Sequence, residues 1–441
     1  MRIVYLTHQY LPHQTGGTEV YTYGLAKRAR RAGHFVQVIT CVESPSLNAA
    51  QYGVLHTEHD GIPVSEIHFN LSVGPNPALA EYNNPFTGTL VEQELENIRP
   101  DLLHAMHLMK VSGSALEVCY TLNIPVVITL ADYWFVCPRH TLLRWNHQLC
   151  NGPAHDLDCM QCLHQTHGFA AGRMQSLPAP LLRFGSNLGC NTLGNRLPRF
   201  WRDIDAIRKR EAYLRRMVER ADRVIALSDF QKEMFVRNGY AADKIQVLHH
   251  GLETEGLERR ASSPKAELEV VFIGSLVYHK GPHILLKALA MRPELRLRIL
   301  LYGDASGSNS YLDSLKAMVA ADDRVSLMGT FALDDMGRVL QTADVLAMPA
   351  LWYENEPLVV KAAKYVGIPV MASNLGTLAT SIRQGQDGWL VPDSDVEAWA
   401  SALARLPLEI RPPRIPDRSI KSMNENAREL FAIYREILSN R

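Results

Sequence analysis

The sequence predicts an α/β protein built from two doubly wound domains with parallel sheets. Apolar runs typical of buried strands alternate with helical segments, and this alternation occurs twice along the chain. A polar stretch separates the two series, and the 441 residues suffice for two domains of ordinary size. Because parallel strands need crossover connections, usually helices, this alternation favours two Rossmann-like sheets in sequence.

The first series begins at the N-terminus. RIVYLTHQYLP predicts a strand, HQTGGTE a glycine-rich turn, and VYTYGLAKRARRAGH a helix that ends at Gly33. FVQVITC then completes a strand–helix–strand unit. We expect further strands in DLLHAMH, IPVVITL and RVIALS, and a helix from Ser114 to Leu122.

The second series repeats this order. It predicts a strand at Leu268–Ile273, a loop to Gly281, a helix at Pro282–Ala290, and strands in LRLRILLYG, RVSLMG, DVLAMPA and PVMAS. The stretch GLETEGLERRASSPK between the two series is polar and has no apolar period. We therefore expect an N-terminal domain over residues 1–255 and a C-terminal domain over residues 266–415.

Composition excludes several classes of protein. Hydrophobic residues make up 46% of the chain and charged residues 21%, as in globular proteins. Lys plus Arg equals Asp plus Glu at 46 each, so nothing global indicates nucleic-acid binding. No run approaches the ~18 apolar residues of a membrane span, and the N-terminus lacks a signal-peptide layout. We expect a cytoplasmic protein, and contact with a membrane surface stays open.

A cysteine-rich loop at residues 137–165 interrupts the α/β pattern. Seven cysteines, an odd number in a long chain, argue against a disulfide scaffold. Four of them gather in this loop: Cys137, Cys150, Cys159 and Cys162. The last two form a Cys-x2-Cys pair, which is typical of structural zinc sites, with His155 and His164 as alternative ligands. The alternative is four thiols without metal in a reducing compartment.

A second interruption covers residues 170–220. LPAPLLRFGSNLGCNTLGNRLPRFWR mixes bulky apolar residues with Arg, Gly and Pro. A lid, an acceptor platform, a membrane-facing patch and an ordinary amphipathic helical insertion are all compatible with this composition. The basic stretch RLPRFWRDIDAIRKREAYLRR would either dock on an anionic membrane or form a charged helix.

Ligands of open α/β sheets bind beyond the carboxyl ends of the strands, so the loops that follow strands are the first candidates for a site. The loop at residues 15–19 contains Gly16 and Gly17, which allow close backbone approach to a ligand. The helix after it offers unpaired N–H groups to an anion. The alternative is a simple turn.

The loops at residues 274–281 and 350–357 offer complementary groups. Lys280, at the base of a predicted helix, can hold a diphosphate as a point charge, or it is an ordinary solvated lysine. In ALWYENEPLVV, Pro357 suits the first helical turn. The amides of Leu358, Val359 and Val360 then lack helical partners and suit phosphate oxygens.

Two acids stand directly before this helix. Glu354 and Glu356 follow Trp352 and Tyr353, and a carboxylate at this place can accept hydrogen bonds from sugar hydroxyls. Helix capping is the alternative, because acids are favoured at a helix N-terminus. For the two aromatic side chains, core packing is the simpler explanation.

Together these segments resemble a retaining glycosyltransferase of glycosyltransferase family 4. The matching segments are YLPHQTGGTEVYTYGLAKRARRAGHFVQVIT, TLADYWFVCPRHTLL, ADRVIALSDFQKEMFVRNGY, FIGSLVYHKGPHILLKAL, ADVLAMPALWYENEPLVV, GIPVMASNLGT and QDGWLVP. They occur in the family's order over nearly the whole chain. The resemblance implies the GT-B fold, in which two Rossmann-like domains face each other across a cleft.

The resemblance also assigns roles. It implies a nucleotide-sugar donor on the C-terminal domain, a glycan or lipid-linked acceptor on the N-terminal domain, and no divalent metal in catalysis. Lys280 aligns with the lysine on the diphosphate, and Glu354 with a glutamate that contacts the donor sugar, so we expect both to be catalytic. The remaining donor-binding candidates are Gly16, Gly17, Ser275, Asn355, Pro357, Leu358 and Val359. A C-terminal helix over residues 420–441 would cross back to the first domain.

Three positions depart from the family pattern. Ala362 stands where a second glutamate is usual, Ser275 replaces an arginine, and Ala131 replaces the histidine of a Thr-x-His-Asp motif. One interpretation is an active enzyme in cell-surface polysaccharide or glycoconjugate synthesis, with missing contacts supplied by His249, His250, His279 or Glu356. It would work in the cytoplasm or at the inner membrane face. The other is a catalytically degenerate relative that binds a ligand or partner.

Overall fold

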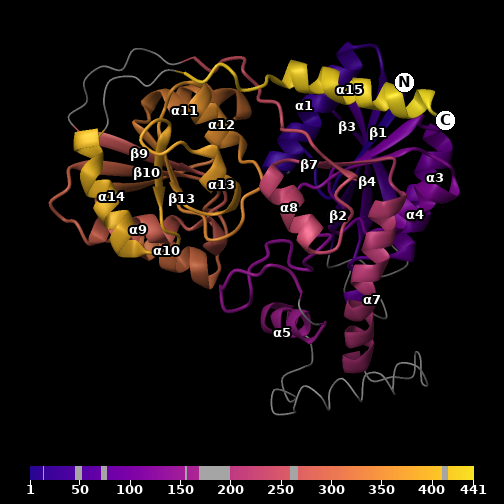
Figure 1. Cartoon of the computed structure of the whole chain (residues 1–441), viewed down its shortest axis with the longest axis horizontal. Coiled ribbons are helices and arrows are strands. Elements are labelled where there is room, and N and C mark those ends of the chain that lie inside the picture. Colours follow the sequence, from indigo (N-terminus) through magenta and orange to yellow (C-terminus); the bar gives the residue numbers. More distant parts are fainter. Residues whose placement is uncertain are drawn as a thin grey trace. The chain divides into compact units, whose positions relative to one another are not determined.

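A computed structural model describes residues 1–12, 14–44, 52–70, 77–153, 156–167, 199–258, 267–409 and 416–441. The chain forms two compact units (Figure 1). Unit 1 comprises Met1–His249 and Asn424–Arg441, and unit 2 comprises His250–Met423. The C-terminal segment is therefore part of the unit in which the chain begins.

Unit 1 is built on an eight-stranded sheet with the order β3-β4-β2-β1-β5-β6-β7-β8. The strands are β1 (Arg2–Leu6), β2 (Phe35–Glu43), β3 (Gly53–His59), β4 (Ile62–Phe69), β5 (Leu102–Ala105), β6 (Val126–Thr129), β7 (Arg223–Ala226) and β8 (Ile245–Val247). Neighbouring strands are parallel except β3 and β4, which form an antiparallel hairpin. The central strand β1 is almost fully buried, as expected for a sheet covered on both faces.

The helices of unit 1 follow its strands. They are α1 (Gly17–Arg31), α2 (Pro77–Ala80), α3 (Pro85–Ile98), α4 (Ser114–Thr121), α5 (Asp156–His167), α7 (Arg199–Arg220), α8 (Asp229–Arg237) and α15 (Met423–Ser439). The start of α8 shows a local sequence cause, because the Ser228 side chain accepts a hydrogen bond from the Gln231 N–H at 3.1 Å.

Helix α15 is anchored in unit 1 by buried polar contacts. The Tyr434 hydroxyl lies 2.6 Å from Nδ1 of His104 on β5, and both side chains are fully buried. The Arg28 side chain on α1 donates to Oδ1 of Asn424 at 2.7 Å, and α15 lies beside α1 in Figure 1. These contacts explain why the C-terminal segment groups with the first half of the chain.

Unit 2 has a six-stranded parallel sheet with the order β11-β10-β9-β12-β13-β14. The strands are β9 (Leu268–Ile273), β10 (Leu297–Tyr302), β11 (Val325–Gly329), β12 (Val345–Met348), β13 (Val370–Ser373) and β14 (Gly388–Val391). The helices are α9 (Pro282–Ala290), α10 (Ser310–Ala320), α11 (Met336–Thr342), α12 (Leu358–Tyr365), α13 (Gly376–Ser381) and α14 (Val396–Glu409), with short 3₁₀ turns η5 (Tyr278–Lys280) and η6 (Leu333–Asp335).

Both faces of the unit 2 sheet are covered. Val270 and Phe272 on β9 belong to one hydrophobic cluster, whereas Val271 between them belongs to another. Successive strand side chains point to opposite faces, so the two clusters lie on the two sides of the sheet. This is the doubly wound arrangement that the sequence predicts.

Helix α7 accounts for part of the insertion predicted at residues 170–220. Residues 199–220 of the predicted insertion form α7, which buries Ile204, Leu214 and Met217 in unit 1, whereas residues 168–198 and His155 lie outside the described part of the chain. The β3–β4 hairpin was not expected from the sequence. In the part of the chain described here, no helix is long and apolar enough to cross a membrane.

Candidate active site

In unit 2, the loops after β9 and β12 meet at one edge of the sheet. The two strands are parallel neighbours, so their carboxyl ends lie side by side. The His279 carbonyl accepts a hydrogen bond from the Leu351 N–H at 2.8 Å. Gly281 has a φ of 73°, and a Cβ there would lie 1.8 Å from the Pro349 carbonyl oxygen. Glycine is therefore required for this close approach of the loops.

Lys280 and Glu354 come together where these loops meet. Nζ of Lys280 lies 2.7 Å from Oε1 of Glu354, and Nε1 of Trp352 donates to the same oxygen at 2.8 Å. The ammonium group also lies 4.9 Å from the centroid of the Trp352 ring. The Glu354 side chain is 5% exposed and that of Lys280 is 22% exposed, so an anion from solvent can reach the ammonium group. The structure thus brings together both residues that the resemblance assigns to catalysis.

The beginning of α12 differs from the prediction. Pro357 has a ψ of 116° and is the N-cap, so the first helical residue is Leu358. The Val360 N–H donates to the Pro357 carbonyl at 3.1 Å, so the prediction that its amide lacks a helical partner is wrong. No side chain caps the helix, and Leu358 and Val359 occupy its first two positions. An α-helix leaves the amides at these positions without an i−4 partner.

Glu356 has a different task from Glu354. Its Oε1 lies 2.7 Å from Nζ of Lys361, and its Oε2 accepts the His250 N–H at 2.6 Å. Lys361 also donates to the His250 carbonyl at 2.5 Å. Burial lowers the pKa of Lys361, although the neighbouring carboxylate opposes this shift. Because both carboxylate oxygens hold the start of unit 2 against α12, Glu356 has a structural role.

Two further predicted donor-binding positions of unit 2 lie in the same two loops, whereas Gly16 and Gly17 belong to unit 1. Ser275 is exposed and follows Gly274 at the end of β9, whereas Asn355 is buried beside Glu354 in sequence. Ala362 is 1% exposed and belongs to a hydrophobic core cluster. A small apolar residue therefore fits at this place, where the family usually has a glutamate.

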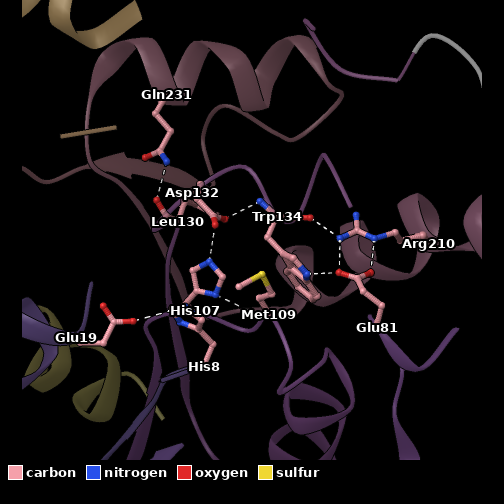
Figure 2. A network of polar contacts seen from close by, with 10 residues as sticks. All are labelled: His8, Glu19, Glu81, His107, Met109, Leu130, Asp132, Trp134, Arg210 and Gln231. Carbon is pink, nitrogen blue, oxygen red and sulfur yellow. Dashed lines mark hydrogen bonds and ion pairs between the residues drawn. The ribbon is translucent and has the colours of Figure 1, made fainter. Parts of the chain in front are cut away.

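Unit 1 has a second cluster of polar groups at the carboxyl ends of its strands (Figure 2). His107 follows β5 and Asp132 follows the neighbouring strand β6. Nε2 of His107 lies 2.6 Å from Oδ2 of Asp132, and the Met109 N–H donates to Nδ1 at 3.1 Å. Since Nδ1 accepts a hydrogen bond, a neutral His107 carries its proton on Nε2 and donates it to Asp132. Burial opposes ionisation of Asp132, but His107 and the Trp134 N–H outweigh it and lower the pKa of this carboxyl.

His8 and Glu19 complete this cluster. His8 follows β1, its ring lies 4.1 Å from that of His107, and its Nε2 lies 3.5 Å from Oε1 of Glu19. Burial first, then the charges of His107 and Lys110, lower the pKa of His8 well below its usual value. Burial raises the pKa of Glu19. Nδ1 of His8 is buried and has no hydrogen-bond partner in the described structure.

Gly16 supports the cluster from the backbone. A Cβ at Gly16 would lie 2.5 Å from Oε2 of Glu19 in the first turn of α1. Gly16 and Gly17 are both exposed. The glycine at residue 16 leaves room for the Glu19 carboxylate in this position, whereas a Cβ at Gly17 would meet nothing within 4 Å.

The segment after Asp132 is held by helix α7. The Trp134 N–H donates to Oδ1 of Asp132 at 2.7 Å, and the indole N–H donates to Glu81. Arg210 on α7 donates to Oε2 of Glu81 at 2.9 Å and to the Trp134 carbonyl at 2.6 Å. Gln231 on α8 donates to the Leu130 carbonyl at 2.6 Å. Figure 2 shows how these contacts surround the loop that carries Asp132.

Sequence reasoning missed His8, Glu19 and His107 as site residues. Their common signal is position, because polar side chains follow β1, begin α1 and follow β5 at the carboxyl edge of one parallel sheet. Ala131 leaves the Thr-x-His-Asp motif without an imidazole. His107 from the neighbouring strand supplies an imidazole beside Asp132 instead.

Comparison with known families agrees with this architecture. The family model described as Glycosyl transferases group 1 matches residues 267–407, which lie in unit 2. The model described as Glycosyltransferase Family 4 matches residues 15–157 and 188–255. The chain belongs to glycosyltransferase family 4. This family 4 glycosyltransferase has the GT-B fold, as two doubly wound units and the structural neighbours below indicate.

The curated relatives of this family 4 glycosyltransferase match only in part. This chain is 32% identical over 199 residues to the D-inositol 3-phosphate glycosyltransferase of Corynebacterium urealyticum. The aligned region covers 42% of this chain and 46% of the relative. Identity to the protein of that name from Corynebacterium glutamicum is 30% over 210 residues, covering 43% and 50%. The chain therefore spans about half the length of these relatives.

Solved structures match over the full length at low identity. Sucrose-phosphate synthase from Thermosynechococcus elongatus aligns with a TM-score of 0.67 and 17% identity, covering 100% of both chains. Anabaena HepE in complex with UDP-glucose aligns with a TM-score of 0.58 and 19% identity, covering 100% of this chain and 99% of HepE. At such identities the likeness concerns the fold.

Proposed function

We propose that this family 4 member transfers a sugar from a nucleotide-sugar donor to a glycan or lipid-linked acceptor, with retention of anomeric configuration. The observation that carries the proposal is the Lys280–Glu354 pair beside the uncapped start of α12. The curated relatives are named glycosyltransferases, and HepE is described in complex with UDP-glucose, which supports a nucleotide-sugar donor. Retention rests on the resemblance to the retaining enzymes of the family.

Unit 2 has the groups that a departing diphosphate requires. The bond between the anomeric carbon and the diphosphate oxygen breaks, and the negative charge on the leaving group increases. The Lys280 ammonium and the amides of Leu358 and Val359 stabilise this charge as fixed donors. When the diphosphate binds the Lys280 ammonium and replaces Glu354 as its partner, the Glu354 carboxylate can accept a hydrogen bond from a hydroxyl of the donor sugar. In this proposal, the chain needs no divalent metal.

Unit 1 has groups suited to the acceptor. The acceptor oxygen forms the new bond to the anomeric carbon as the bond to the diphosphate oxygen breaks, and the hydroxyl proton leaves with the diphosphate. The lowered pKa keeps the His8 ring neutral, and a proton on Nε2 toward Glu19 leaves the buried Nδ1 as an acceptor with no partner among the described residues. It is therefore suited to accept a hydrogen bond from a substrate hydroxyl. The His107 ring, fixed by its hydrogen bond to Asp132, packs against the His8 ring.

The alternative of a degenerate binding protein receives less support. Two of the three departures are compatible with a working site, because His107 places an imidazole beside Asp132 and Ala362 packs in the core. The third, Ser275, is exposed and removes a positive charge near the diphosphate. Family membership and the preserved Lys280–Glu354 pair favour an enzyme.

A cellular role follows from this proposal. Transfer to a glycan or lipid-linked acceptor fits polysaccharide or glycoconjugate synthesis in the cytoplasm, at the inner membrane face when the acceptor is a lipid. Vesicle flotation with and without anionic lipid tests the membrane contact.

Turnover with activated sugars tests the proposal. Release of UDP, GDP, dTDP or ADP is followed after incubation with the corresponding nucleotide sugars, with and without mixed glycan and lipid-linked acceptors. We expect one nucleotide class to be released, release in EDTA to equal that in buffer, and an acceptor product with the donor's anomeric configuration by NMR. Binding of a nucleotide without any transfer or slow hydrolysis would instead support the degenerate alternative.

A further inference from the structure

The four cysteines of the cysteine-rich loop line one small cavity in unit 1. This cavity has a volume of about 30 Å³, and the thiols around it are those of Cys137, Cys150, Cys159 and Cys162. They come from three pieces of chain: the loop after β6, the segment after a short bridge at Leu143 and Leu149, and the first turns of α5. None of the four forms a disulfide. Folding thus gathers thiols that are up to 25 positions apart in sequence.

Backbone amides are directed at one of these sulfurs. The N–H groups of Arg139 and Leu142 both donate to the Cys137 sulfur. Leu142 and His140 have φ values of 51° and 53°, so this chain reversal holds left-handed backbone at two residues with side chains. Burial raises the pKa of the Cys137 thiol to about 11, and these two amide donors oppose that shift. A metal-bound sulfur would keep both hydrogen bonds.

The charges around the cavity fit a metal thiolate. Four thiolates around one Zn²⁺ have a net charge of −2, which nearby positive groups and N–H donors stabilise. Arg139 and Arg144 line the cavity, and Asp158 is a single acid among the lining residues. Arg139 is fixed at the cavity by donating to the Leu143 carbonyl at 2.8 Å, and both guanidinium groups would offset the charge of a bound metal thiolate.

We propose that the four cysteines bind one Zn²⁺ as a closed structural site. Four thiols release four protons to solvent as the sulfurs coordinate the ion, with no change in oxidation state. Among the described side chains, no group of three or more ligands is already arranged for a metal, and the Cys150 thiol donates to the Gly152 carbonyl at 3.3 Å. Binding therefore includes rotation of thiol side chains toward the cavity.

The zinc site would position the segment that carries Asp132. Helix α5 packs against α7 through Met160, Leu163, Ile204 and Ile207, with Cys159 at the edge of the cluster (Figure 1). Arg210 on α7 holds Trp134, which donates to Asp132. The ion would join the loop after Asp132 to α5, and thus reinforce the contact of this loop with α7. Its role is positioning, with no contact to substrate.

The metal content of the purified protein tests this inference. The full chain is purified in reducing buffer without added metal, and zinc is measured by mass spectrometry and by release on titration with a mercurial thiol reagent. We expect about one zinc per chain, released as the site thiols react. Single Cys→Ser changes at residues 137, 150, 159 and 162 should each remove zinc, whereas Cys41→Ser and Cys119→Ser, at buried thiols outside the cavity, should retain it.

Two outcomes would overturn the inference. One is wild-type protein without zinc whose melting temperature changes neither with Zn²⁺ nor with a chelator. The other is a disulfide within the cluster found by mass analysis of the non-reduced protein. If a serine variant fails to fold, zinc release from the wild type still decides. Because no readout depends on sugar transfer, failure of this inference is distinguishable from failure of the proposed function.

Discussion

The two units place different chemistry at the carboxyl ends of their strands. In unit 2 an ammonium–carboxylate pair lies beside an uncapped helix start, with the lysine partly exposed. In unit 1 a buried histidine pair lies between carboxylates, and the environment keeps His8 neutral. The same strand-to-loop architecture thus carries groups suited to an anion in one unit and a neutral imidazole, that of His8, in the other. The proposed transfer of a sugar from a nucleoside diphosphate to a hydroxyl would use both kinds of group.

The largest expected effect on turnover comes from removing the Lys280 ammonium group in unit 2. Lys280→Ala should lower turnover by about two to three powers of ten, because a fixed donor to the leaving group is lost. Steady-state release of nucleoside diphosphate measures this loss. Lys287→Ala on the exposed face of α9 is the matched control and should leave turnover unchanged. Equal turnover in the two variants would contradict the role of Lys280.

Substitutions of the two acids before α12 should have different effects, one on stability and the other on turnover. Glu356→Gln leaves the partly buried Lys361 without its carboxylate, and should lower the free energy of unfolding by about 2 kcal/mol. Glu354→Gln should mainly reduce turnover, since its partner Lys280 remains accessible to solvent. Urea denaturation and turnover of both variants test this division. Loss of stability in Glu354→Gln together with loss of turnover in Glu356→Gln would contradict these roles.

A smaller effect is expected at Asp132. Asp132→Asn removes the charge beside His107 and disturbs the acceptor side, so turnover should fall by roughly tenfold while binding of a nucleoside diphosphate to unit 2 stays unchanged. Asp205→Asn, at an acid on α7 that pairs with Lys209, is the control. If Asp132→Asn weakens diphosphate binding as strongly as turnover, the separation of tasks between the units is wrong.

The smallest effect concerns stability and pH. The folded-state pKa of His8 is lowered, so below about pH 6.5 the unfolded chain takes up a proton that the folded chain does not, and stability falls as pH falls. His8 is flanked by Glu19 and His107, with Lys110 and His140 contributing charge. His8→Gln should therefore reduce the loss of unfolding free energy between pH 7 and pH 5, by at most about 1.4 kcal/mol per pH unit. Identical pH slopes in urea denaturation would show that His8 titrates normally.

Much of the fold could be predicted because local signals agreed with tertiary structure. The strand at Leu268–Ile273 and the helix at Pro282–Ala290 have the predicted bounds, since the apolar run, the Pro after Gly281 and the flanking turns all mark them. The β3–β4 hairpin was missed although Asp60-Gly61, with φ of 48° and 74°, is a typical two-residue hairpin turn. A search for this signal would have found it.

The site was less predictable, because its contacts join distant residues. The neighbouring strands β9 and β12 explain why Lys280 and Glu354 meet, and sequence pattern alone indicated this only through their positions after strands. Nothing local distinguishes Glu354 from Glu356, whose partners Lys361 and the His250 backbone are set by packing. The ring contact between His8 and His107 joins residues 99 positions apart and needs the folded sheet.

Calorimetric titration with nucleoside diphosphates is the most direct test of the anion site in unit 2. UDP, GDP, dTDP and ADP are titrated into wild type and Lys280→Ala, together with the phosphate-free nucleosides. We predict that one diphosphate binds the wild type, that its nucleoside binds much more weakly, and that Lys280→Ala weakens the diphosphate at least about tenfold. A diphosphate that binds both proteins equally, or no binding of any diphosphate, would contradict this account.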